Sequence, residues 1–389
     1  MPGRSSVARR EQAANEASQM RARITIFASI IQAILFAVHW FVFATWMSFM
    51  GAAQTPGVWA AKIILVLLSV SFVITSLLAF RYSDMLIRIF YTISAVWLGM
   101  LSFFFLAASL SWLTRTATVF LGLPVHKQTI ALLFFVLAAC ASACAIINAF
   151  WIRVRRISVK LANLPESWRG RVAALVSDVH LGHVRGRGFT QRIVHMLLRL
   201  RPDVVFITGD LFDGTSANLE RVAKPWVHLA PPLGAFFVAG NHEEFSDHSK
   251  YLDAVRASGI RVLDNEKISL DGVDLVGVHH GALVHSDTFR SILRKASLDP
   301  KRPSILLAHA PDQLQIAEEE GVSLQLSGHT HRGQFFPWTW VTSRIYGPFV
   351  YGLKRLGRLL VYTTSGAGTW GPPMRLGASP ELVLIHFEY

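Results

Sequence analysis

The sequence predicts an α-helical membrane domain followed by an α/β domain, and two observations support this division. Apolar residues gather in long, charge-poor runs within residues 1–152, whereas residues 153–389 have the mixed composition of an ordinary globular domain. In that second part, short apolar runs alternate with segments of helical spacing, which is typical of an α/β layered fold. The predicted organisation is a basic polar tail (1–23), a transmembrane domain (24–152), a basic juxtamembrane linker (153–170) and an α/β domain (171–389).

Four apolar segments are long enough to cross a bilayer, which requires about 20 residues in a helix. A single charged residue, Lys62, interrupts them, near a segment end where its ammonium group can reach the interface. The predicted transmembrane helices are Ile24–Met50, Val58–Phe80, Ile89–Leu113 and Ile130–Ile152.

The charges that flank these segments predict their orientation. The tail over 1–23 and the linker over 153–170 are rich in arginine, whereas the first connection, 51–57, carries no charge. Basic flanks favour the cytoplasmic side, so we expect both chain ends and the α/β domain in the cytoplasm, with the helices in the cell (inner) membrane. Arg115 and Lys127 in the third connection reduce this contrast.

Charge and cysteine content argue against a nucleic-acid partner and against a disulfide framework. The net charge is +13, but no nucleic-acid-binding signature accompanies it, so we expect no nucleic-acid partner. The two cysteines, Cys140 and Cys144, both lie in an apolar segment, and the α/β domain has none. A disulfide framework is therefore excluded for that domain.

Polar side chains follow five predicted strands of the α/β domain, at the point where each strand ends. Ligands of α/β folds gather at the carboxyl ends of strands, so we expect these side chains to lie close together. The potential metal ligands among them are Asp178, His180, Asp210, Asn241, His309, His329 and His331.

This ligand set combines carboxylates and imidazoles with one amide and no thiolate, which suits divalent Mn, Fe, Zn, Ni or Co. Seven ligands are too many for one ion that keeps a position open, whereas two ions that share a carboxylate fit the number. Two neighbouring ions can bind both sides of a phosphoryl group and acidify a water molecule. The sequence therefore predicts a dinuclear metal site for phosphoryl chemistry, with manganese among the candidates.

The motifs resemble those of the calcineurin-like metallophosphoesterases, in that family's order. The matching elements are Asp178-x-His180, Gly209-Asp210-x-x-Asp213, Gly240-Asn241-His242-Glu243, His309 and Gly328-His329-x-His331. The resemblance covers roughly residues 171–389 and is closest to a branch with membrane-anchored members, which the segment 365–375 also resembles. Arg332 stands where that branch commonly has glycine.

The resemblance implies a four-layer αββα sandwich and a role for each matching residue. Asp178, His180 and His331 would hold the first metal. Asn241, His309 and His329 would hold the second, and Asp210 would bridge the two. His242 would face the substrate phosphate and protonate the leaving oxygen or stabilise charge. Asp213 would either orient a ligand histidine or cap the following turn, and Glu243 has the same two alternatives.

The implied enzyme is a membrane-anchored metal-dependent phosphoesterase. Relatives in the family hydrolyse UDP-diacylglucosamine, which suggests a lipid-linked phosphoester or pyrophosphate, a role in lipid metabolism and contacts with membrane lipids. A soluble phosphodiester, a cyclic nucleotide or a phosphoprotein are the other substrates considered. The alternative is a membrane sensor or transport component whose phosphoesterase-like domain only binds ligands, although the complete ligand set argues against it. The oligomeric state stays open.

Three further segments have two interpretations each. The aromatic and cationic residues of 335–340 and 346–358 indicate either a surface that contacts the membrane interface or an aromatic core. His183, with Arg185 and Arg187 nearby, indicates either a phosphate-binding cluster or a mobile basic loop. The two histidines at 279–280 lie either at the rim of the site, where they contact the substrate, or apart from the substrate.

Overall fold

The computed structural model describes residues 3–51, 56–244 and 247–388. The chain divides into two compact units. The first contains Met1–Leu78 and Trp97–Cys140, and the second contains Ala79–Val96 and Ala141–Tyr389. The second unit therefore includes the connection between the second and third long helices, the end of the fourth, and the whole α/β domain.

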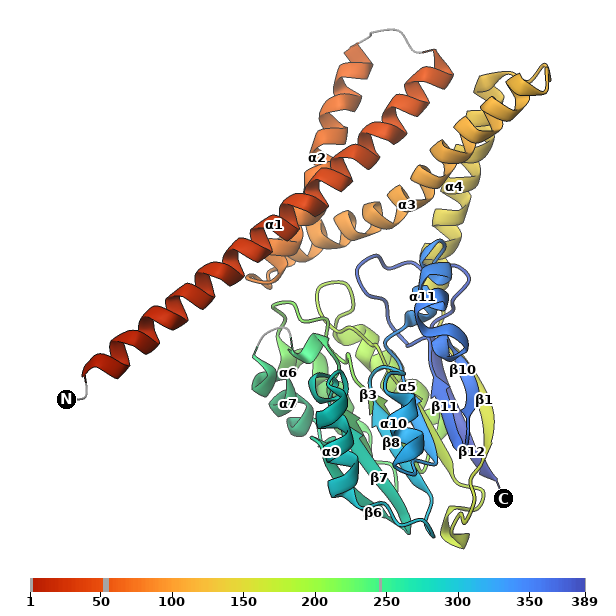
Figure 1. The fold of residues 1–389 in the computed structure, drawn as a ribbon. Helices are drawn as coiled ribbons and strands as arrows, with labels where there is room; N and C mark the ends of the chain where they lie inside the picture. Colours follow the sequence, from red (N-terminus) through yellow and green to blue (C-terminus); the bar gives the residue numbers. More distant parts are fainter. Residues whose placement is uncertain (1–2, 52–55, 245–246, 389) are drawn as a thin grey trace. The chain divides into compact units, whose positions relative to one another are not determined.

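Four helices of the N-terminal part are long and apolar enough to cross a membrane, as predicted. They are α1 (Gly3–Met50), α2 (Pro56–Ala79), α3 (Met85–Phe120) and α4 (Lys127–Ala149) (Figure 1). Helix α1 begins at Gly3, so the predicted polar tail is helical from Gly3 onward and runs directly into the first apolar segment. Polar side chains of the first unit pair with each other: Trp97 Nε1 donates to His39 Nε2 at 2.8 Å.

Two six-stranded sheets form the centre of the α/β domain. The first contains, in spatial order, β1 (Arg153–Lys160), β12 (Glu381–Glu388), β2 (Val172–Val176), β3 (Val204–Thr208), β4 (Ala235–Val238) and β5 (Arg261–Val262). The second contains β10 (Gly352–Leu356), β11 (Leu359–Thr363), β9 (Leu324–Ser327), β8 (Ser304–Ala308), β7 (Val273–Val278) and β6 (Glu266–Leu270).

The predicted juxtamembrane linker is wrong for residues 153–160, which form the edge strand β1. This strand pairs in parallel with β12, from Arg153 beside Glu381 to Lys160 beside Glu388. Ile157 and Val159 pack into the core between the sheets, whereas the basic residues of the strand stay exposed. Exposed charge on an edge strand is a common way to prevent further strand pairing, and it made this segment resemble a solvated linker.

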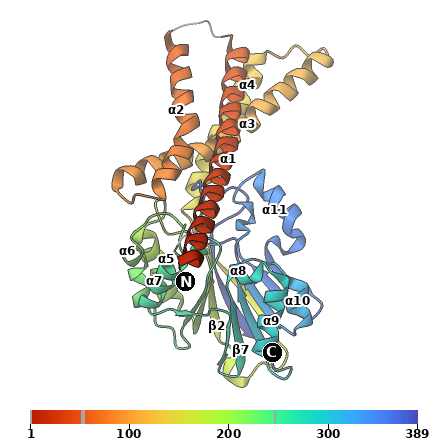
Figure 2. The ribbon, with the colours of Figure 1, turned by 60° about the vertical axis from the view of Figure 1, so that its left-hand side comes forward.

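The two sheets pack face to face, with helices on both outer faces, so the predicted αββα layering is confirmed (Figure 2). In β2, Ala173 and Leu175 face the core between the sheets, while Ala174 and Val176 face the helices. Strands buried on both faces read as continuous apolar runs. The helices on the first sheet are α5 (Arg187–Leu200), α6 (Leu219–Ala223) and α7 (His248–Ala257), and those on the second are α8 (His280–Leu283), α9 (Ser286–Ala296) and α10 (Leu314–Glu319).

Parallel pairing brings the carboxyl ends of the central strands to one edge of each sheet. Strands β2, β3 and β4 are parallel neighbours in the first sheet, as are β7, β8 and β9 in the second. The polar motifs follow β2, β3, β4, β8 and β9 directly, so the sandwich gathers them at one end of the domain.

Candidate metal centre

The loops after β3, β4, β8 and β9 bring four of the predicted ligands together. His309 Nε2 lies 3.1 Å from Asp210 Oδ2, 3.1 Å from Asn241 Oδ1 and 3.1 Å from His329 Nδ1. The other ring nitrogen of His309 donates to the carbonyl of Thr208 at 2.7 Å. Nε2 is therefore the ring nitrogen of His309 that faces a carboxylate, an amide oxygen and a second imidazole.

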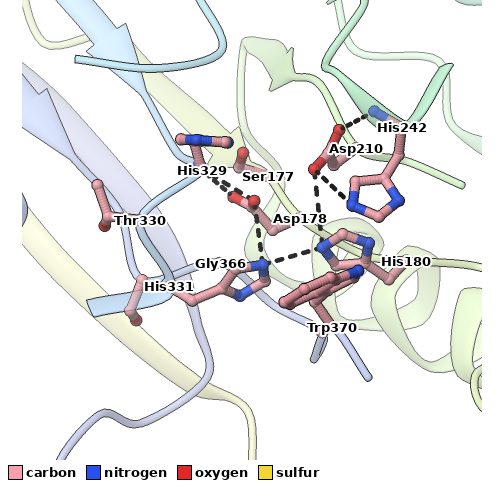
Figure 3. A network of polar contacts seen from close by, with 12 residues as sticks. Ser177, Asp178, His180, Asp210, His242, His329, Thr330, His331, Gly366 and Trp370 are labelled. Carbon is pink, nitrogen blue, oxygen red and sulfur yellow. Dashed lines mark hydrogen bonds and ion pairs between the residues drawn. The ribbon is translucent and has the colours of Figure 1, made fainter. Parts of the chain in front are cut away.

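A second group forms where the loop after β2 meets the loop after β9 (Figure 3). His331 Nε2 lies 3.4 Å from Asp178 Oδ1 and 2.9 Å from His180 Nε2. The backbone N–H of His329 donates to both carboxylate oxygens of Asp178, at 3.1 and 3.0 Å, and so ties the two loops together. His180 Nε2 lies 3.8 Å from Asp210 Oδ2, which makes Asp210 the residue that faces both groups.

The donor atoms of both groups fit metal ions. In each group, ligand atoms from three Asp or His residues lie within 4.8 Å of one another, and most of these side chains are buried. Converging carboxylate oxygens and imidazole nitrogens in a buried site suit a divalent cation. The structure therefore brings together all seven residues that the sequence predicted as metal ligands.

Burial lowers the pKa of three of the ligand histidines, whereas the charge of Asp210 and its hydrogen bond outweigh burial and raise the pKa of His309 to about 10. Burial lowers the pKa of His180 and of His331 well below the usual value, and that of His329 to about 3. It also raises the pKa of Asp178 to about 6. Neutral imidazole is the ligand form of histidine, so the lowered pKa of these rings favours metal binding at neutral pH.

The site residues have an unusual backbone conformation. Asp178, His180, Asp210, His329 and His331 have φ between 48° and 67°, in the left-handed region. Such a conformation costs a residue with a side chain about 1–3 kcal/mol and is found mainly at functional sites. The surrounding sandwich must offset this cost in order to aim the five side chains inward.

His242 lies at the edge of the two groups, and its backbone and ring are both held. Its N–H donates to Asp210 Oδ1 at 3.0 Å, and its ring Nδ1 donates to the carbonyl of Asp213 at 2.8 Å. The ring centroid lies 4.7 Å from that of His180 and 6.1 Å from the exposed Trp370. These contacts leave Nε2 as the ring atom that faces the site, 3.9 Å from Asp210 Oδ2.

The carboxylate of Asp213 caps the turn after β3, which was one of its two predicted roles. It accepts the N–H of Thr215 at 2.8 Å and that of His183 at 3.3 Å. The carbonyl of the same residue, rather than its carboxylate, contacts a site histidine.

Glu243 joins two of the loops that carry the site. Its buried carboxylate accepts the N–H groups of Asp210, Phe212 and Gly240 at 3.0, 2.9 and 2.8 Å. It therefore positions backbone instead of orienting a ligand histidine. Burial, with the nearby charge of Asp210, raises its pKa to about 8.

We expect Glu243→Gln to weaken metal binding by about 10- to 100-fold, because its NH₂ group cannot accept, so at least one of the three N–H bonds that position the loops of Asp210 and Gly240 is lost. Metal content after dialysis, measured by mass spectrometry of the ions, checks this result. Glu388→Gln, at an exposed position of β12, is the matched control. Equal metal retention by Glu243→Gln and the control would contradict the positioning role.

Arg375 is a site residue to which the sequence analysis assigned no role. It is fully buried, donates to the carbonyls of His331 and Ser365 at 2.8 Å each, and places Nη2 2.9 Å from His331 Nδ1. A guanidinium can only donate, so Nδ1 of His331 accepts and the proton of the neutral ring lies on Nε2, which faces Asp178 and would release that proton on binding a metal. The segment 365–375 contained this arginine, but only the fold shows where it points.

Arg375→Leu should lower the melting temperature by roughly 5 °C or more, because buried carbonyls left without a donor cost about 1–3 kcal/mol each. Thermal unfolding of the detergent-solubilised protein, followed by tryptophan fluorescence, measures the shift. Arg355→Leu, at an exposed position of β10, should leave it unchanged. A melting temperature at the wild-type value in Arg375→Leu would show that water replaces the guanidinium without loss.

The structure also bears on two of the three segments that had two interpretations. Helix α11 (Trp338–Tyr346) has no buried residue, and Trp338 and Trp340 are 51% and 57% exposed, so this part of the aromatic segment forms surface. The two histidines of 279–280 separate: His279 Nδ1 contacts Glu244 Oε1 at 2.9 Å, while the ring of His280 lies 5.6 Å from that of His329. Only the second therefore borders the site.

Comparison with known proteins identifies the family. The family model described as calcineurin-like phosphoesterase matches residues 172–333. A protein of Aquifex aeolicus, described as an uncharacterized metallophosphoesterase, is 32% identical over 258 residues, which cover 64% of this chain and 97% of that protein. The chain belongs to the calcineurin-like metallophosphoesterases. Membership confirms the predicted class of enzyme, a metal-dependent phosphoesterase.

Two further metallophosphoesterases are similar to this chain. A "transmembrane protein with metallophosphoesterase domain" of Danio rerio is 33% identical over 288 residues, which cover 70% of this chain and 65% of that protein. A relative from Helicobacter pylori is 33% identical over 215 residues, covering 54% of this chain and 58% of its own length. The chain therefore spans less than two thirds of these two relatives. The four apolar helices and the name of the Danio rerio protein agree with a membrane protein.

Proposed function

We propose that this metallophosphoesterase hydrolyses a phosphoester or pyrophosphate bond with two divalent ions. The observation that carries the proposal is the position of Asp210 between two groups of ligand atoms. Asp178, His180 and His331 would hold one ion, Asn241, His309 and His329 the other, and Asp210 both. The mixture of oxygen and nitrogen donors suits Mn, Fe, Zn, Ni or Co. When bound, the ions would neutralise charge on the phosphoryl oxygens and acidify a water molecule.

The protein's own contribution to the reaction centres on His242. The hydrogen bond from its Nδ1 to Asp213 fixes the ring, and Nε2 faces the two groups of ligands. We assign to this nitrogen the proton that passes to the leaving oxygen. A histidine can supply a proton near neutral pH and regain it from solvent. The ring of Trp370 lies beside that of His242 in an edge-to-face arrangement, with the two centroids 6.1 Å apart.

A lipid-linked substrate is the finer part of the proposal. Its support is the exposed aromatic surface of α11 together with Trp370, which is 57% exposed beside His242. Arg344 lies over the ring of Trp340 at 5.1 Å, so the same surface combines cations with aromatic rings. Such a surface suits the interface of a bilayer. Arg332 lies over Tyr351 at 4.6 Å and adds a further cation.

We also propose that the catalytic domain lies in the cytoplasm. The α2–α3 connection belongs to the same compact unit as the α/β domain, and Arg88 Nε donates to the carbonyl of His183 at 2.9 Å. The basic residues of the α2–α3 connection and those of β1 therefore belong to the same unit. The positive-inside rule places such basic flanks on the cytoplasmic side of the membrane.

Hydrolysis by the detergent-purified full-length protein with added Mn²⁺ tests the proposal. The two substrates are an aryl phosphodiester and a lipid-linked pyrophosphate in micelles, with Asp210→Asn as the blank. Preference for the lipid supports the whole proposal, and cleavage of the aryl ester alone supports the chemistry but not the lipid substrate. Protein that retains two ions and cleaves neither would favour a sensor or transport component with a non-catalytic binding domain.

A further inference from the structure

A cavity of about 620 Å³ lies in the second unit, apart from the metal ligands. Its walls come from the α2–α3 connection, from the loop and helix start over 182–191, and from the segment 216–222. None of the seven proposed metal ligands lines it. Its volume is within the range of about 300–1,000 Å³ that is usual for ligand sites.

The charges that line this cavity have one sign. Arg88, Arg187 and Arg221 line it, and no aspartate or glutamate is among the described lining residues. Arg88 uses its Nε on the carbonyl of His183, whereas Arg187 and Arg221 have no side-chain hydrogen bond or ion pair within the described ranges. Arginines without partners around a cavity leave their guanidinium donors directed to solvent or to a ligand.

A second feature of the cavity also favours an anion. Helix α5 has 14 residues and begins at the cavity wall, with Gly186 as its N-cap and no side-chain cap. The first N–H groups of such a helix have no partner inside the helix and carry partial positive charge. Gln191 and Asn218 add neutral polar groups to the lining.

Asp213, which lies against Gly182 of the wall, has a carboxylate that is already hydrogen-bonded. The carboxylate of Asp213 accepts the N–H groups of Thr215 and His183. It therefore does not neutralise the arginines through an ion pair.

We propose that this cavity is a second anion site, which binds a phosphate group. Arginine is the side chain best suited to phosphate because its planar fork makes two parallel hydrogen bonds to the oxygens. The wall contains the connection between two membrane spans, and Ser216 N donates to the carbonyl of Ala79, the last residue of α2, at 2.9 Å. The phosphate of an anionic lipid headgroup therefore reaches this site from the bilayer, and free phosphate reaches it from solution.

Binding measurements on the full-length protein with Arg187→Gln and Arg221→Gln combined test the site. Both side chains are exposed and unpaired in the described structure, so the double variant should fold normally. Arg199→Gln, also exposed on α5, is the matched control. Native mass spectrometry in detergent measures the binding of phosphatidylglycerol, with diacylglycerol as the lipid that lacks phosphate. Calorimetry measures the binding of inorganic phosphate.

We expect the double variant to bind phosphatidylglycerol at least about tenfold more weakly than the wild type and the control, with diacylglycerol unaffected. A loss confined to inorganic phosphate would support the site with free phosphate as its ligand. Phosphate bound at the metal ligands would remain in the double variant, so only the difference reports on the cavity. Equal affinity of wild type and double variant for both probes would overturn the proposal.

The same samples separate this site from the proposed function. Hydrolysis of the aryl phosphodiester depends on Asp210 and should not depend on Arg187 or Arg221. An inactive protein that still shows arginine-dependent phosphate binding would sink the proposed function and leave the anion site standing.

Discussion

Replacement of Asp210 by asparagine is expected to lower kcat/KM for phosphodiester hydrolysis by about a thousandfold or more and to remove bound metal. The carboxylate faces both groups of ligands, with Oδ2 3.1 Å from His309 Nε2 and 3.8 Å from His180 Nε2. Asparagine keeps the shape but loses the charge that both ions would share. Charge stabilisation by bound metal contributes several kcal/mol, and each 1.36 kcal/mol is about a factor of ten in rate.

The number of bound ions is measured together with the rate of hydrolysis, so that loss of metal and loss of activity can be compared in the same variant. Asp287→Asn, exposed in the first turn of α9, should retain both metal and activity. Near-wild-type hydrolysis by Asp210→Asn with two ions bound would contradict the bridging role. Loss of one ion only, together with residual hydrolysis, would assign Asp210 to a single ion.

His242→Ala should lower kcat by roughly 10²- to 10⁴-fold while the metal content stays at the wild-type level. The proposed metal set does not include His242, and its ring is held by Asp213 at the edge of the site. The loss should be largest for an alkyl phosphoester, whose leaving oxygen needs a proton, and smaller for an aryl ester that leaves readily as an anion. Kinetics with both ester types, combined with metal analysis, measures this difference.

His195→Ala, exposed on α5, is the control and should behave as the wild type. An equal loss for both ester types would indicate that His242 stabilises charge instead of donating a proton. Loss of metal from His242→Ala would contradict the assignment altogether and make this residue a ligand.

The site was predictable because its ligand-type residues directly follow short apolar runs that form strands. Asp178, Asp210 and His309 each follow a short apolar run, and the αββα sandwich brings the ends of those runs together. Strands buried on both faces have a strong apolar signature, so β2, β3, β4 and β8 appear in the sequence as short apolar runs.

Elements that depend on distant partners were missed. The edge strand β1 has basic residues on its exposed side, and only its pairing with β12, more than two hundred residues away, shows that Val159 belongs to the core. Arg375 had no role assigned from the sequence, yet it is fully buried against His331. Burial of a charge depends on partners that local sequence does not reveal.

The sequence by itself determined the two-part organisation, the apolar helices, the identity of the ligand-type side chains and the family. Hydropathy and residue type are local properties, so they can be read without knowing the fold. Only the tertiary structure decided which nitrogen of His309 faces Asp210, that Glu243 holds backbone, and that Arg88 and Arg221 line one cavity. These facts depend on backbone conformation and long-range packing, which bring together residues that are far apart in the chain.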